Sequence, residues 1–399
     1  MKTQLSLFEQ SVLEGVAARG STSGCYDFVA NKVGLTKDDM QEKVFRGEKA
    51  GYVGKWQHKI RVVQQKLKAM GLIEKANDRG SWRMTGAGKD QLTFVPINGM
   101  KLYYTTENGM AFWGDSMHLP DTFSNSIDLV ITSPPYLLQK PRKYGHIGMN
   151  EQEYVDNLVS AIENWLPMLT PTASIVLNIG NSIKAGEGYQ NLHKESLLLA
   201  LRDRLGLFLI QKFYWYSPTK MPSGHWVNIA HRDCVDSVED FYWLSMNPKQ
   251  CKADNRQVLV EYSKTQRRYM KSAQTKSGVR KNPSGQSVNE ETFYADRGGA
   301  IPSNLLFAVP EGANSQYSRY CRENNLPRHP AMFSPNLPDF FIRYLTNIGD
   351  VVADFYFGSG STGYASESQN RHWIGAEIVK EYLDGSMGRF LNRNIKKLH

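Results

Sequence analysis

The sequence contains few cysteines, and none of them lies in a pattern that binds metal. Its 399 residues include four cysteines, at positions 25, 234, 251 and 321, without any Cys-x-x-Cys pair. This spacing argues against a zinc site and against a secreted disulfide framework, and it is typical of proteins from a reducing cytoplasm. We therefore expect a cytoplasmic protein without a bound metal.

Long apolar runs are also missing. No stretch of 18 or more apolar residues occurs, so we expect no membrane-spanning helix. Glu9 and Glu14 interrupt the apolar start of the chain, which also lacks a cleavage site, and both features argue against a secretory signal peptide. The chain does have an excess of cations, with a net charge of +9, and this excess favours a polyanionic partner.

Residues 1–92 are predicted to form a separate helical unit. The segment 72–85 alternates like two short strands around a polar turn at residues 77–80. Apolar spacing, an N-cap at Thr36 and a terminal glycine at position 71 predict helices before it, over residues 7–16, about 26–33, from 36 onward and about 53–70. Helices followed by a two-stranded ribbon resemble the winged-helix domains that are fused to restriction and modification enzymes.

The longest helix of this unit is rich in basic side chains. Lys55, Lys59 and Arg61 lie on it, and helices of this kind commonly enter a DNA major groove. We therefore expect these three residues to contact DNA. The alternative is a solvated basic helix in a dimerisation or scaffolding module.

From residue 100 to residue 246 the chain alternates between apolar strands and amphipathic helices. The pattern predicts helices over about 151–169 and 192–205, with strands near 102–104, 110–113, 127–131, 174–179 and 207–216. Such alternation is typical of an α/β fold in which crossover helices connect parallel strands.

A buried strand of this region ends abruptly in Ser133-Pro134-Pro135-Tyr136. Neither proline can donate a ladder hydrogen bond, so the chain must leave the sheet there. A hydroxyl, a carbonyl and an aromatic ring then lie at the carboxyl end of a strand, where open α/β sheets bind ligands. Ser133 and the Pro134 carbonyl could accept hydrogen bonds from an amino group while Tyr136 stacks on the base that carries it. A proline-terminated strand with a core tyrosine is the structural alternative.

The last hundred residues contain a second stretch that predicts ligand binding. A strand over 351–355 leads through the glycine-rich turn 356–363 into a helix, and the next strand, over 372–378, carries Glu377. Glycines let the backbone approach a nucleoside, and the acid can bind ribose hydroxyls. Nothing like a second dinucleotide half follows, and Asp354 is placed to meet a cationic amine, so S-adenosylmethionine fits better than NAD.

Together these stretches resemble the bacterial amino-methyltransferases of DNA. TSPPY at 132–136 comes first and DFYFGSGST at 354–362 comes last, as in the β arrangement of that family, although the proline usual after the aspartate is lost. Supporting stretches lie at 114–116, 177–181, 221–223, 239–243, 329–333 and 371–377. The resemblance covers roughly residues 100–390 and implies contacts to S-adenosylmethionine by Asp115, Asp354, Tyr356, Phe357, Gly358, Ser359, Gly360, Thr362 and Glu377.

The resemblance also implies a domain organisation. We expect a Rossmann-like methyltransferase sheet made of a catalytic part, 100–246, and a cofactor-binding part, 311–399, beside the small winged-helix domain at 1–92. The inserted segment 247–310 would be a target-recognition region, because residues 249–281 include ten Lys or Arg and only two acidic residues. Its candidate DNA contacts are Arg267, Arg268, Lys271, Arg280 and Lys281. As a free chain the segment would be a solvated basic loop.

The implied reaction is methyl transfer to the exocyclic amino group of a flipped base in double-stranded DNA, within a restriction–modification system. Ser133 stands where the family's adenine enzymes mostly carry Asp, which favours cytosine N4 and leaves adenine N6 as the alternative. Methylation of a ring carbon needs a cysteine nucleophile, usually after a proline, and no Pro-Cys dipeptide occurs. A second alternative is a non-catalytic DNA-binding regulator. A cognate restriction endonuclease is a candidate partner, and the sequence leaves monomer and homodimer open.

Overall fold

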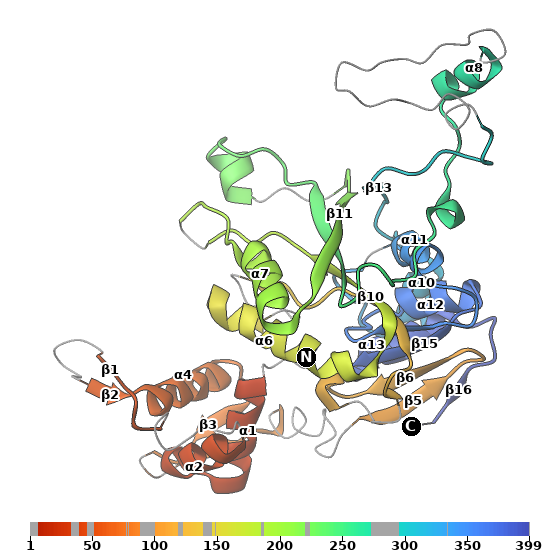
Figure 1. Ribbon diagram of the computed structural model, residues 1–399. Coiled ribbons are helices and arrows are strands. Elements are labelled where there is room, and N and C mark those ends of the chain that lie inside the picture. The colour runs from red at the N-terminus through yellow and green to blue at the C-terminus, as the bar shows by residue number, and fades with distance from the viewer. Residues whose placement is uncertain are drawn as a thin grey trace.

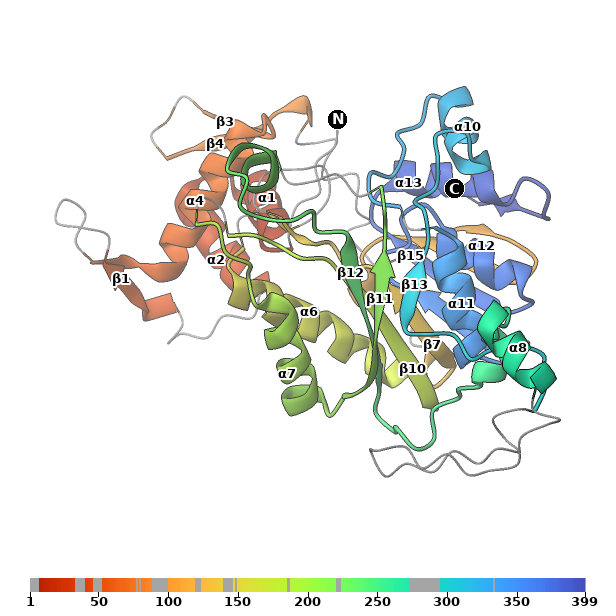
Figure 2. The same cartoon turned by 90° about the horizontal axis from the view of Figure 1, so that it is seen from above.

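A mixed sheet of ten strands, covered by helices on both faces, forms the centre of the computed structural model (Figures 1 and 2). The structure describes residues 7–32, 40–45, 52–76, 78, 80–87, 100–118, 123–138, 146–147, 149–184, 187–219, 224–272, 295–332 and 334–398. The strand order is β13-β11-β12-β10-β7-β14-β15-β6-β5-β16. The bounds are β5 Lys101–Thr105, β6 Gly109–Trp113, β7 Ile127–Thr132, β10 Leu169–Ile179, β11 Phe208–Tyr216, β12 Val238–Ser245, β13 Leu305–Phe307, β14 Val351–Asp354, β15 His372–Glu377 and β16 Lys396–Lys397.

Parallel strands occupy the middle of the sheet. β10, β7, β14, β15 and β6 pair in parallel, whereas β12 runs antiparallel between β10 and β11. All six residues of β7 are buried, as expected for a central strand that is covered on both faces. The predicted α/β sheet is therefore confirmed, and the carboxyl ends of its parallel strands meet at one edge.

Two hydrophobic layers hold the helices on the sheet. On one face α6 (Glu151–Trp165) and α7 (His193–Leu205) pack against alternate β7 residues such as Val130. On the other face α11 (Asn336–Leu345) packs against Leu129 and Ile131, and it also contacts α12 (Ser361–Ser368). Two further helices, α10 (Gln316–Glu323) and α13 (Lys380–Ser386), contact each other. No helix in these described parts of the chain has the length and apolarity to cross a membrane.

The N-terminal unit has its own small core and lies beside α6 (Figure 1). It comprises α1 (Leu7–Arg19), α2 (Thr22–Lys32), α4 (Lys55–Ala69) and the antiparallel ribbon of β3 (Ile73–Lys75) and β4 (Trp82–Met84). α2 begins about four residues earlier than predicted, because the Ser21 hydroxyl accepts a hydrogen bond from Gly24 N and so caps it. The sequence did not predict the hairpin of β1 (Lys43–Phe45) and β2 (Tyr52–Gly54). The helix start predicted at Thr36 lies outside the described residues.

Both ends of the inserted segment 247–310 contact the part of the chain that forms the large sheet. Its first part packs on the body, where Lys252 Nζ lies 2.9 Å from Asp128 Oδ1 and 2.8 Å from Asp350 Oδ1. Its last part belongs to the sheet, since β13 pairs with β11. Between them, α8 (Lys264–Ser272) lies at the end of an arm that stands clear of the sheet (Figure 1). The segment 137–150, predicted as a loop, contains the short paired strands β8 (Leu137–Leu138) and β9 (His146–Ile147).

Candidate active site

The two predicted ligand-binding stretches meet at the carboxyl edge of the sheet. β7 and β14 are parallel neighbours, so the chain leaves the sheet at the same edge after Thr132 and after Asp354. The Thr132 hydroxyl donates to Asp354 Oδ1 at 2.6 Å. The backbone N–H of Tyr356 lies 3.2 Å from Thr132 Oγ1 and 3.1 Å from Asp354 Oδ1. The two stretches are thus joined by direct hydrogen bonds.

Tyr136 is held by two side chains that sequence reasoning did not assign a role. Its Oη lies 2.9 Å from Asn178 Oδ1, at the end of β10, and 2.7 Å from Glu239 Oε2, near the start of β12. Asn178 Nδ2 donates to the carbonyl oxygen of Asp240 at 3.2 Å, which fixes the orientation of the amide. Ser133 Oγ lies 3.3 Å from the same Asn178 oxygen. In the sequence, both residues are polar side chains at one end of an apolar strand, and this pattern could have identified them as site residues.

A glycine makes room for the Tyr136 ring. A Cβ atom at Gly180 would lie 2.6 Å from Tyr136 Cε2, closer than side chains tolerate. Burial raises the pKa of the Tyr136 phenol well above its ordinary value, and the negative charge of Glu239 raises it further. Tyr136 is therefore a neutral hydrogen-bond donor at all physiological pH values.

The glycine-rich turn after β14 adopts a backbone that needs glycine. Gly358 and Gly360 have φ angles of +51° and +76°, in the left-handed region that other residues rarely adopt. Glu377 Oε2 accepts the N–H of Gly358 at 2.7 Å, and Glu377 Oε1 accepts the N–H of Val379 at 2.8 Å. At the start of α12, Thr362 Oγ1 donates to Asp354 Oδ2 at 2.7 Å. These bonds hold the turn between two buried carboxylates.

Both carboxylates are less acidic than exposed ones. Burial raises the pKa of Asp354 to about 6, although the Thr132 and Thr362 hydroxyls oppose the shift. Burial likewise raises the pKa of Glu377 to about 7, against the opposing N–H groups of Val379 and Gly358, and the nearby Asp354 adds to the increase. A cationic ligand would favour the ionised forms of both groups, so this pair suits a ligand that carries positive charge.

Other predicted cofactor contacts have structural partners. The Phe357 ring stacks on Trp373, with centroids 5.2 Å apart and an interplanar angle of 10°, and belongs to the core, so only its backbone lines the turn. The carbonyl of Ser359 accepts from the buried Arg389 Nε at 2.7 Å, and Arg389 also pairs with Glu311. Asp115 Oδ1 accepts the N–H of Met117 at 3.0 Å.

His329 is a further side chain at the turn that the sequence did not single out as a site residue. A Cβ atom at Gly358 would lie 3.1 Å from His329 Nε2, so the imidazole packs directly on the turn. The His329 ring also packs against Tyr382, whose ring centroid is 4.7 Å away. Burial lowers the pKa of His329 to about 4, and the ring is therefore neutral.

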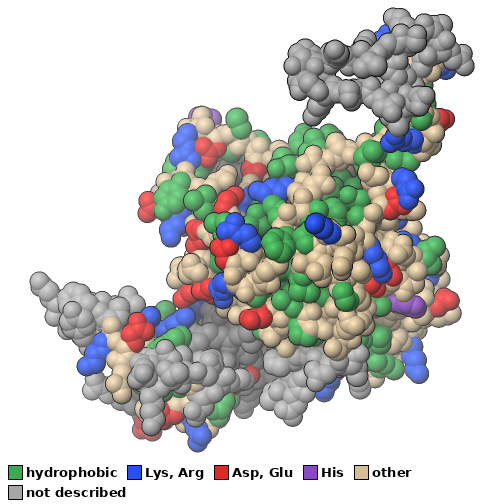
Figure 3. Space-filling model, viewed as in Figure 1, with side chains coloured by type: hydrophobic (Ala, Val, Ile, Leu, Met, Phe, Trp, Pro, Cys, Tyr) green, Lys and Arg blue, Asp and Glu red, His purple; other side chains and the backbone are tan. Residues whose placement is uncertain are grey.

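The residues predicted to contact DNA lie in three places: on α8, outside the described residues, and in the N-terminal unit. Arg267, Arg268 and Lys271 of α8 are exposed on the arm, where Figure 3 shows basic side chains, and Arg267 pairs with Glu261 at 2.8 Å. Arg280 and Lys281 lie outside the described residues. In the N-terminal unit, Lys55 pairs with Glu42 at 2.8 Å, Lys59 with Glu153 of α6 at 3.1 Å, and Arg61 donates to the Tyr26 hydroxyl at 2.6 Å.

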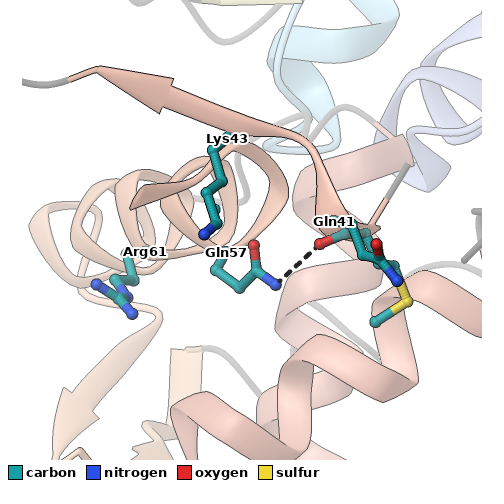
Figure 4. A pocket seen from close by; sticks show the side chains of 6 residues that line it. Gln41, Lys43, Gln57 and Arg61 are labelled. Atoms are coloured by element: carbon teal, nitrogen blue, oxygen red, sulfur yellow. Dashed lines mark hydrogen bonds between the residues drawn. The ribbon is translucent and has the colours of Figure 1, made fainter. Parts of the chain in front are cut away.

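A hollow of about 630 Å³ lies between α4 and the hairpin of β1 and β2 (Figure 4). Two cations, Lys43 and Arg61, line it together with Gln57, whose Nε2 donates to the carbonyl oxygen of Met40 at 3.4 Å. The sequence did not predict it, because Lys43 belongs to a hairpin that has no clear pattern. Among the residues that the structure describes, no group of three or more His, Cys, Asp or Glu could hold a metal ion.

Comparisons with known proteins bear on this site. A family model described as DNA methylase matches residues 127–388. The chain is 36% identical over 315 residues to the type II methyltransferase M.PvuII of Proteus hauseri, covering 78% of this chain and 91% of that protein. It is 23% identical over 274 residues to the type II methyltransferase M.BglII of Bacillus subtilis, covering 68% and 66%. The solved structure of the PvuII DNA methyltransferase (cytosine-N4-specific) matches with a TM-score of 0.58 and 33% identity, over 72% of this chain and 88% of that one.

Proposed function

This chain belongs to the DNA methylase family, and on that premise we propose that it transfers a methyl group from S-adenosylmethionine to the N4 amino group of a cytosine in double-stranded DNA. We choose cytosine because the residue at the carboxyl end of β7 is Ser133, an uncharged hydrogen-bond acceptor. Its Oγ lies 3.3 Å from Asn178 Oδ1. Similarity to the cytosine-N4-specific PvuII enzyme supports the same choice. We further propose that the reaction belongs to a type II system, in which a restriction endonuclease acts on the same DNA site.

The residues of the turn suit S-adenosylmethionine. Its sulfonium supplies a methyl group that is already activated for transfer to nitrogen. Glu377 would accept ribose hydroxyls, and Asp354 would add negative charge on the side of the turn that faces β7. Gly358 and Gly360 allow the backbone to approach the nucleoside closely. The raised pKa values of the two acids are consistent with a site that binds a cation.

The loop after β7, from Ser133 to Tyr136, would hold a flipped cytosine. The Ser133 hydroxyl and the Pro134 carbonyl would accept the two N–H groups of the amine and aim its lone pair at the methyl group, while the Tyr136 ring stacks on the base. Because Thr132 joins this loop to Asp354, the two ligands are held in a fixed relation. Positioning of this kind supplies much of the acceleration in a displacement between two bound groups.

Two surfaces outside the sheet would contact DNA. We place phosphate contacts on the arm, where α8 exposes Lys264, Arg267, Arg268 and Lys271. We also propose that the N-terminal unit is a winged helix that binds DNA. Lys59 of this unit pairs with Glu153 and so attaches the unit to α6. We therefore propose that DNA binds on the other side of α4, where Arg61 and Lys43 of β1 line the hollow.

Sequencing of modified bases tests the proposed function. Genomic DNA from bacteria that express the protein, analysed by single-molecule detection of modified cytosine and adenine, should show methylated cytosine at one recurring sequence. The same cells expressing Ser133→Ala should show none, because the amine acceptor is lost. A recurring methylated adenine, or no modified base with the unchanged protein, would overturn the proposal.

A further inference from the structure

The cluster around Tyr136 has one proton too few for its contacts. Tyr136 Oη makes two short contacts, to Glu239 Oε2 at 2.7 Å and to Asn178 Oδ1 at 2.9 Å, and both partners are hydrogen-bond acceptors. A phenol carries a single proton, and the Asn178 amide cannot turn over because its Nδ2 already donates to the Asp240 carbonyl. While Glu239 is ionised, one of the two contacts therefore lacks a proton. Protonation of Glu239 would satisfy both.

The charged pair next to Glu239 lies on the opposite face of the sheet. Side chains alternate across β12, so the Asp240 carboxylate and its partner Lys194 point away from the Glu239 side. The β11 residue opposite Glu239 is the uncharged Trp215. Two further titratable groups near the cluster are Tyr154, close to Tyr136, and His193, whose Nε2 lies 3.1 Å from the Gly180 carbonyl oxygen.

The proposed reaction produces the missing proton. A neutral amine that gains a methyl group becomes cationic and must lose a proton before the product is released. We propose that Glu239 takes up this proton through Ser133 and Tyr136, as the far end of a relay that starts at the target amine. This relay presupposes the proposed function.

The atoms and charges of the step balance. The nitrogen–methyl bond forms as the sulfur–methyl bond breaks, and sulfur keeps the bonding electron pair as a neutral thioether. The amine passes a proton to Ser133 Oγ, the Ser133 proton moves to Tyr136 Oη over 3.5 Å, and the Tyr136 proton moves to Glu239 Oε2 over 2.7 Å. The 3.5 Å step is long, and catalytic hydrogen bonds of this kind commonly tighten when substrate binds. Glu239 afterwards releases the proton to solvent.

The two partners of Tyr136 thus have different roles. An amide oxygen is a very weak base, so Asn178 orients the hydroxyls without holding a proton. A carboxylate can hold one, so Glu239 acts as a positioning residue whose effect on the amine passes through Tyr136 and Ser133.

Glu239→Gln is an informative variant, because its amide can donate to Tyr136 Oη and imitate protonated Glu239 without taking up a proton. With saturating S-adenosylmethionine and DNA, we expect a single-turnover rate of methyl transfer about 10²-fold below that of the unchanged protein. The dissociation constants of both ligands should stay unchanged. Glu187→Gln, which changes an exposed acid of the loop after β10, is the matched control.

Tyr136→Phe tests the same relay from its middle, since it keeps the ring and removes the hydroxyl. It should lose as much rate as Glu239→Gln, and the double variant should be no slower than either single one. Full rate in Glu239→Gln, or rate losses that multiply in the double variant, would overturn the relay while methylated cytosine from the unchanged protein upholds the proposed function. No methyl transfer by the unchanged protein would overturn both.

Discussion

The Thr132 hydroxyl and the Asp354 carboxylate, 222 positions apart in the chain, share a buried hydrogen bond of 2.6 Å. This contact joins the ends of two parallel strands, each of which leads into one of the two loops that we propose to bind ligands. The second carboxylate oxygen of Asp354 accepts the Thr362 hydroxyl, so the same acid also anchors the start of α12. The relative position of these two loops is therefore set at the edge of the sheet.

We expect Thr132→Val to weaken this junction. The substitution keeps the shape of the side chain but removes a donor from a buried carboxylate, which should lower the free energy of unfolding by about 1–3 kcal/mol. Affinity for S-adenosylmethionine should fall as well. Urea unfolding and calorimetric titration measure the two effects, with the exposed Thr219→Val as control. Unchanged values for both would show that the contact has no structural role.

The raised pKa of Glu377 predicts a pH-dependent stability of the ligand-free protein. Between its ordinary value of 4.5 and about 7, the folded protein binds more protons at this group than the unfolded chain does. The free energy of unfolding should therefore fall as pH rises through this range, by an amount of the order of 1–3 kcal/mol. Glu377→Gln should remove this part of the pH dependence in urea unfolding. A variant with the same pH dependence as the unchanged protein would contradict the assignment.

Gly180→Ala should impair base binding without affecting the cofactor. The new methyl group would lie 2.6 Å from Tyr136 Cε2 and would push the ring out of its position. We expect slower methyl transfer with an unchanged dissociation constant for S-adenosylmethionine. Gly312→Ala is a suitable control, because a Cβ atom there would meet nothing within 4 Å. Equal transfer rates in both variants would show that Tyr136 does not need this position.

The arm should contribute to the salt dependence of DNA binding. Each phosphate that a cation neutralises adds about 0.9 to the slope of log affinity against log salt, so Arg267→Ala with Arg268→Ala should flatten the slope by about two. Arg202→Ala with Arg204→Ala on α7 removes the same charge elsewhere and serves as control. Fluorescence anisotropy of labelled DNA at several salt concentrations measures this slope for the unchanged protein and for both double variants. A flattening in the control pair alone would move the DNA surface away from the arm.

Much of the methyltransferase part was predictable, because its chemistry follows from local pattern. The strand before Ser133 is apolar and ends in prolines, and the turn at Gly358 and Gly360 needs glycine, so both loops could be located without knowing what they pack against. The parallel alternation of strands and helices then implied that the two loops share one edge of the sheet.

Pairings between distant segments were not predictable. Glu239 reaches Tyr136 because β12 runs antiparallel beside β10, a register that no local pattern specifies. For the same reason Lys252, counted with the basic insert, instead pairs with Asp128 and Asp350 on the body. A strand as short as β13 carries too few residues to show an alternation, so the sequence did not reveal that this part of the insert joins the sheet.

Identification of the methylated nucleoside tests the central claim most directly. Unmethylated double-stranded DNA incubated with the purified protein and S-adenosylmethionine would be digested to nucleosides and analysed by mass spectrometry beside the Ser133→Ala variant. We predict N4-methylcytosine from the unchanged protein and none from the variant. N6-methyladenine, 5-methylcytosine or an absence of any methylated nucleoside from the unchanged protein would contradict the account.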